Sequence, residues 1–220
     1  MLDVTNLIGF GVGVSKSSPK IVSHTTALNS AGSTSISCAK PSGTQSGDFI
    51  IAFLCLGQVI NSGVWNVPSG WTSAFVRNQR AILYKVAGGS EPASYTFTNN
   101  ILSIPLVSLV TVRPASFDAV GTISSATTNP SAPALSVAGD SSVFCVVTQT
   151  VANNSNTYEW LLEGWQTLVP RFGATNAGDL NNMTTYMKVF YRDDLDAGLV
   201  GPVSVTSTVT ARAQLFSCKV

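Results

Sequence analysis

Charged side chains are scarce in this chain. Of its 220 residues, 12 are Lys or Arg and 11 are Asp or Glu, so only 10% carry charge, against roughly 25% in an ordinary soluble domain. Interspersed charge normally keeps a lone monomer soluble, so the deficit favours a protein whose surface is covered by neighbouring subunits. A surface that is polar but uncharged, as on many extracellular β proteins, stays open as the alternative. Lys and Arg are scattered singly and form no basic stripe, and the sequence therefore predicts no nucleic-acid partner.

The chain also lacks the residue patterns on which most catalysis depends. It has one histidine, His24, whereas general acid–base catalysis uses histidine most often, and it has no Gly-x-Ser-x-Gly elbow for a serine nucleophile. An acidic run at 193–196 could hold calcium, but its spacing does not match an EF-hand, and a solvated turn is the simpler interpretation. We therefore expect no enzymatic activity, no cofactor and no metal site.

Cysteines occur without the spacing of a metal or redox motif. No Cys-x-x-Cys pair exists, and a single histidine cannot complete a zinc site. We expect free, buried thiols, which fit assembly in a reducing cytoplasm; a bridge between the first and the last of them stays open. The four positions are Cys38, Cys55, Cys145 and Cys218.

No apolar run is long enough to cross a membrane. The longest runs, 49–56 and 101–112, fall short of the roughly 20 residues that a spanning helix needs. The N-terminus has no basic region followed by a long apolar one, so we expect no signal peptide.

The chain contains one order of landmarks twice. The landmarks of the first half are Gly47-Asp48, the apolar run 49–56, Gly70-Trp71, a lysine-bearing segment at 82–86, and a proline before the alternating stretch 95–98. Those of the second half are Gly139-Asp140, 143–147, Gly164-Trp165, 186–190 and a proline before 203–208. Repetition of a whole strand programme points to architecture rather than to chemistry.

Short runs of β-branched and aromatic residues, separated by frequent turn signals, predict an all-β protein. We expect an antiparallel, jelly-roll-like β-sandwich over 21–220, built from pseudo-repeats 21–113 and 134–220 with a crossover at 114–133. One short segment, 156–163, is shaped like a capping box before a stopping glycine and predicts one or two helical turns.

Glycine alternates with apolar residues in a distinct opening segment, residues 1–20. No strand precedes this tract and no helix follows it, so it does not fit a dinucleotide-binding loop. We expect an extended arm that lies on a neighbouring subunit, with Leu7, Ile8 and Phe10 as apolar anchors; a frayed tail is the alternative.

The repeated Gly-Asp and Gly-Trp pairs predict structure rather than a ligand site. Asp48 and Asp140 are expected to bond nearby backbone amides in turns before buried strands. Trp71 and Trp165 are expected to fill the ends of the core. Tryptophan can also stack on sugars, and Trp65 and Trp160, whose counterparts in the repeat are weaker, are the better candidates for an exposed aromatic platform.

These landmarks resemble a group of structural proteins from tailed-bacteriophage virions. The resemblance is carried by Gly-Asp before an apolar run, Pro-Ser-Gly-Trp-Thr at 68–72, Leu-Tyr-Lys-Val-Ala at 83–87 and Ser-Glu-Pro-Ala-Ser-Tyr-Thr-Phe-Thr at 90–98. It is good over residues 40–112 and weaker over 135–220. It implies a β-sandwich in a virion role, and we expect a capsid decoration or cement protein bound to the major capsid protein or another virion protein. The scarcity of charge further leads us to expect a homo-oligomer, with a trimer favoured. A carbohydrate-binding head- or tail-fibre module for host attachment is the alternative. The resemblance brings no catalytic residues.

Overall fold

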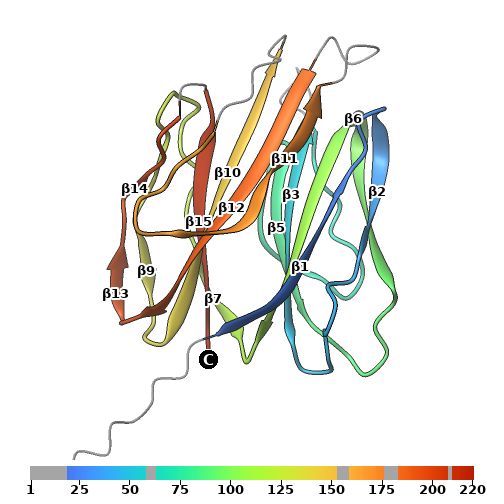
Figure 1. The fold of residues 1–220 in the computed structure, drawn as a ribbon. Helices are drawn as coiled ribbons and strands as arrows, with labels where there is room; N and C mark the ends of the chain where they lie inside the picture. The colour runs from blue at the N-terminus through green and yellow to red at the C-terminus, as the bar shows by residue number, and fades with distance from the viewer. Residues whose placement is uncertain (1–18, 58–62, 153–158, 176–182, 208–209) are drawn as a thin grey trace, which may run out of the picture.

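The predicted β-sandwich is confirmed. The computed structural model describes residues 19–57, 63–152, 159–175, 183–207 and 210–220, and these ranges form fifteen strands arranged around two large antiparallel sheets packed together (Figure 1). The described part of the chain holds no helix of the length and hydropathy needed to cross a membrane.

The first large sheet is built by the first half of the chain. Its order is β1 (Lys20–Leu28), β6 (Ser94–Arg113), β3 (Phe49–Gly57), β5 (Arg80–Val86) and β4 (Thr72–Arg77). β2 (Ser33–Ala39) pairs only with the N-terminal part of β6.

The second large sheet is built by the second half. Its order is β7 (Ser116–Val120), β15 (Arg212–Lys219), β10 (Ser141–Ala152), β12 (Met183–Leu195) and β11 (Gln166–Thr175). Two short pairs lie outside it: β8 (Ser131–Ala132) with β14 (Val203–Ser204), and β9 (Leu135–Val137) with β13 (Gly198–Val200).

The two sheets share one topology, which extends the repeat seen in the sequence. β7 runs antiparallel along β15 as β1 runs along β6, with Ser116 opposite Lys219 and Lys20 opposite Arg113. The predicted crossover 114–133 therefore contains the edge strand β7 and the short strand β8, so most of it belongs to the second half rather than to a linker.

The core lies in three layers because strands of both sheets are buried on two faces. β3 is buried along its whole length, as expected for a continuous apolar run. One face of each sheet forms the contact between the halves, where Phe53 lies 5.8 Å from Phe144 and 6.1 Å from Phe216, measured between ring centroids. The opposite faces pack beneath the outer strands of their own halves.

The 20-residue strand β6 belongs to two layers of the first half in turn. Its N-terminal part pairs with β2 in the outer layer, and from Ile104 onward it pairs with β3 in the sheet. The alternating stretch 95–98 and the apolar run 101–112, noted separately in the sequence, therefore belong to one strand. In the second half, the matching segment is interrupted: β14 has two residues, Thr206 forms an isolated bridge to Leu161, and β15 begins at Arg212.

The predicted helix at 156–163 is wrong where the structure describes it. Leu161 pairs with Thr206 in an isolated β-bridge, and residues 156–158 lie outside the described ranges. The capping-box pattern reports only neighbouring residues, whereas Leu161 pairs with Thr206, a residue far along the chain, in place of a helical hydrogen bond.

Candidate functional site

The two Gly-Trp pairs form the same turn in both halves. The Trp71 N–H donates to the Pro68 carbonyl at 3.1 Å, and the Trp165 N–H donates to the Leu162 carbonyl at 3.3 Å. Gly70 has φ 79° and Gly164 has φ 76°, the conformation that a type II turn requires at its third residue. Because the two turns have the same geometry, Trp71 and Trp165 occupy corresponding positions in the two halves. A difference in their exposure therefore arises from the segments that pack over them.

Trp71 is covered by aromatic side chains of β6. The ring of Tyr95 lies 5.3 Å from it at 90°, and that of Phe97 lies 5.2 Å away at 67°. Such edge-to-face contacts are favourable for aromatic rings. Trp71 is 9% exposed, which confirms the prediction that it belongs to the core.

A polar cluster closes the first half above Trp71. Glu91 accepts hydrogen bonds from Lys85 Nζ at 2.8 Å, the Tyr95 hydroxyl at 2.8 Å and the Gly88 N–H at 2.6 Å. Burial alone would raise the pKa of Glu91, but these donors lower it overall. Burial and the neighbouring Glu91 raise the pKa of Tyr95. The cluster holds Tyr95 against the tryptophan.

The second half carries no such cover in its described residues. The buried positions of its covering segment are Val203, Val205 and Ser207, and none of them is aromatic. The residue before the proline, where the first half has Glu91, is Gly201. Trp165 is consequently only half-buried, although it still packs against the core of its half.

Strand register identifies the residue that stands where Lys85 stands. Lys85 lies opposite Ile50, and Arg192 lies opposite Val143. Ile50 and Val143 both face the outer layer of their halves, so Arg192 occupies the position of Lys85. The sequence instead suggested Lys188, which is buried and donates from Nζ to the Trp160 carbonyl at 2.9 Å.

The missing cover leaves a groove of about 370 Å³ in the second half. Trp165 lines it. The other lining residues are Leu162, Glu163, Arg192, Val200, Gly201, Pro202, Val203 and Ser204. A half-buried tryptophan beside an acidic residue, Glu163, and a basic residue, Arg192, suits a sugar as ligand. The apolar face of a sugar ring can stack on an indole, and the hydroxyls of the sugar can form hydrogen bonds with polar side chains nearby. The first half has the same scaffold with this space filled.

The Gly-Asp pairs, which look identical in sequence, differ by one residue in the structure. Gly47 takes φ 89°, whereas in the second half Asp140 takes φ 56°. Asp140 therefore stands where Gly47 stands, and Ser141 stands where Asp48 stands. The expectation that Asp48 and Asp140 are equivalent is wrong, because Asp tolerates the left-handed region better than most side chains and can take the turn position itself. Gly139 is not in that region.

Asp48 bonds the turn as predicted and also forms an ion pair. It accepts from the Gln45 N–H at 2.7 Å and from Arg113 through Nε at 2.5 Å and Nη2 at 2.6 Å. The Arg113 hydrogen bonds hold the pKa of Asp48 below its usual range. In the second half this role passes to Asp118, which accepts from the Ser141 hydroxyl at 3.3 Å and the Ala138 N–H at 3.2 Å.

The exposed aromatic platform expected at Trp65 and Trp160 is wrong. Trp65 is 2% exposed and Trp160 is fully buried, each in the outer core cluster of its half. Both tryptophans contribute to packing and neither offers a face to a ligand.

The remaining predicted residues are the anchors of the arm and the cysteines. Residues 1–18 lie outside the described ranges, and with them the predicted anchors Leu7, Ile8 and Phe10. The four cysteines are free and buried; Cys38 and Cys218 belong to different core clusters and do not pair. Burial raises the pKa of Cys145 to about 12.

The described residues hold no group of three or more His, Cys, Asp or Glu side chains that could bind a metal ion. Comparison of the chain with protein-family models, with curated proteins and with solved structures finds no match.

Proposed function

We propose that this chain is a structural component of a tailed-bacteriophage virion, and specifically a capsid decoration or cement protein. The proposal rests on the resemblance of residues 40–112 and on the scarcity of charge, which suits a surface covered by other subunits. The partner in this proposal is the major capsid protein or another virion protein. The protein would be a homo-oligomer, with a trimer favoured, located in the virion after assembly in the host cytoplasm.

The observation that supports this proposal best is the anchored root of the predicted arm. Pro19 is buried, and its carbonyl accepts a hydrogen bond from the Ser142 hydroxyl of β10 at 3.1 Å. The next residue, Lys20, already pairs with Arg113 at the start of β1. Pro19 and Lys20 thus form a fixed point in contact with both halves, and an arm that attaches to a neighbour needs such a root.

Deletion of residues 1–14 tests this role. We expect the truncated protein to fold, because its first described strand begins at Lys20, and to lose attachment to the particle in a co-sedimentation assay. Alanine at Leu7, Ile8 and Phe10 together should have the same effect, whereas alanine at Thr5 and Asn6 should leave attachment intact. Full attachment of the truncated protein would refute the proposal.

The groove beside Trp165 favours a second candidate, a carbohydrate-binding module used in host attachment. Glycan-array binding should then be lost in Trp165→Ala, since the indole supplies the stacking face. Leu102→Ala, which removes an exposed apolar side chain from the other half, serves as the control. An empty array, or binding that survives Trp165→Ala, would exclude this candidate.

A further inference from the structure

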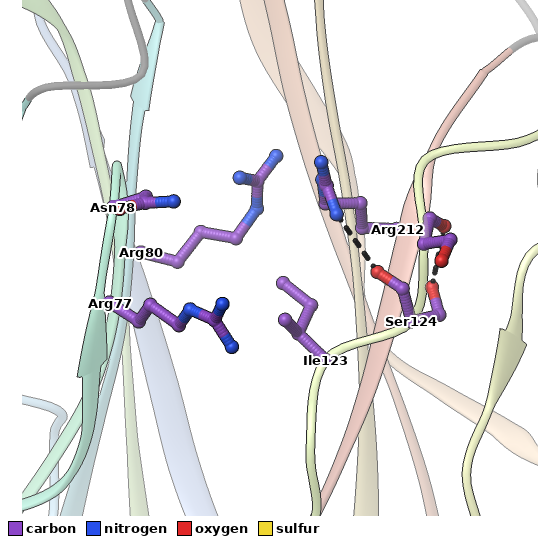
Figure 2. A pocket seen from close by; sticks show the side chains of 7 residues that line it. Arg77, Asn78, Arg80, Ile123, Ser124 and Arg212 are labelled. Carbon is purple, nitrogen blue, oxygen red and sulfur yellow. Dashed lines mark hydrogen bonds between the residues drawn. The ribbon is translucent and has the colours of Figure 1, made fainter.

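A second cavity lies where the two halves meet, away from the groove of Trp165. It has a volume of about 290 Å³. One wall comes from the turn between β4 and β5, and the other comes from the segment after β7 and the start of β15. Figure 2 shows the side chains of these walls facing each other across the pocket. The lining residues are Arg77, Asn78 and Arg80 from the first half, and Ile123, Ser124, Ser125 and Arg212 from the second.

The pocket concentrates positive charge. Three of the 12 basic residues of the chain line it. Within the described ranges, the ion pairs join other cations to carboxylates, namely Lys85 to Glu91, Arg113 to Asp48 and Lys188 to Glu159. The arginines of the pocket therefore face one another without a described carboxylate between them.

Burial makes this arrangement costly for the folded protein. Arg80 is only 9% exposed. Burial lowers the pKa of Arg80; the neighbouring Cys55 opposes this shift, and the positive charge of Arg212 adds to it. A buried charge normally has a partner, because an unpaired one is expensive to remove from water. An anion in the pocket would supply the missing compensation.

Hydrogen bonds to the protein hold two of the arginines in place. Arg80 donates from Nε to the Thr148 hydroxyl at 2.7 Å, and Arg212 donates from Nη1 to the Ser124 carbonyl at 3.0 Å. Each bond uses one N–H of a guanidinium that has five. Figure 2 shows the ends of both arginine side chains, with the amide of Asn78, in the space between the two walls.

We propose that this pocket binds a phosphate group. Guanidinium forks match the oxygens of phosphates and carboxylates. Three converging guanidinium groups favour the doubly charged phosphate over a singly charged carboxylate, and the Asn and Ser groups add neutral hydrogen-bonding partners. The group could be free phosphate or a phosphate ester on a sugar, since both present the same oxygens.

Thermal unfolding and calorimetric titration with inorganic phosphate, at constant ionic strength set with chloride, test the site. Phosphate should raise the unfolding midpoint in a saturable way, as a ligand of the native state does. Arg77→Gln and Arg212→Gln should each weaken binding by about tenfold or more, the effect of losing one charge-assisted hydrogen bond. Arg77 is exposed, so its substitution tests binding without disturbing the core.

Lys20→Gln is the matched control, because it removes one positive charge from an exposed position on β1. It should bind phosphate like the unmodified protein. Tighter binding of glucose 1-phosphate than of inorganic phosphate would assign the site to a sugar phosphate, and equal or weaker binding would assign it to free phosphate. No saturable response to either compound, or an equal loss in Lys20→Gln and Arg77→Gln, would overturn the proposal.

Discussion

The two halves of the molecule share a strand order and a Gly-Trp turn, yet they treat the tryptophan differently. In the first half, Tyr95 and Phe97 pack edge-on against Trp71, and Glu91 fixes Tyr95. In the second half, the covering segment is short and aliphatic, and Trp165 lines a groove. The comparison teaches that a duplicated scaffold can cover a tryptophan in one copy and leave a groove beside its counterpart in the other.

Removing an aromatic side chain that covers Trp71 in the first half should give the largest loss of stability. Phe97→Ala should lower the free energy of unfolding by about 3–5 kcal/mol, the usual cost of deleting a fully buried Phe, and should expose Trp71 to solvent. Val205→Ala, at a fully buried position of the covering segment of the second half, removes less volume and should cost about 1–2 kcal/mol. Denaturant unfolding measures both. Equal losses of unfolding free energy in the two variants would show that both covering segments contribute alike to stability, and would contradict the proposed difference in packing between the halves.

The Gly-Asp turns should respond differently to loss of their carboxylates. Asp48→Asn breaks an ion pair whose Arg113 partner is 39% exposed, so solvent screening limits the expected loss to about 1–2 kcal/mol. Asp140→Asn should be close to neutral, because Asn adopts the left-handed conformation readily.

The same pair of variants gives a pH test. The pKa of Asp48 is lowered in the folded state, so its contribution is present at neutral pH and is lost as the pH falls below about 4, through the lowered pKa. Asp48→Asn should flatten this acid part of the stability profile, and Asp140→Asn should leave it unchanged. An acid profile that is the same in both variants would contradict the assignment of the carboxylate role to Asp48.

Much of the architecture could be predicted from the sequence, because the strands carry their own signals. The apolar run 49–56 and the turn glycines before the tryptophans marked β3 and both Gly-Trp turns at nearly the right residues. What failed was what depends on distant segments. The burial of Trp65 and Trp160 is set by outer strands that come from elsewhere in the chain, and no local pattern reports it.

Residue identity also misled where two side chains can serve one backbone position. Asp140 and Gly47 occupy the same turn position, so aligning identical letters placed the second half one residue out of register. The arginine pocket had no sequence signal either, because Arg212 lies far along the chain from Arg77 and Arg80. Pairing of β4 with β5 places Arg77 beside Arg80, and the packing of the two sheets, rather than spacing in the sequence, brings Arg212 to them.

Oxidation of the four tryptophans by N-bromosuccinimide, followed by peptide mass spectrometry, tests the difference between the halves most directly. The chain contains four tryptophans, and all can be read in one experiment. Trp165 should be oxidised first, while Trp65, Trp71 and Trp160 should react only as the protein unfolds. Oxidation of Trp71 at the rate of Trp165, or protection of Trp165 in the native protein, would contradict the account.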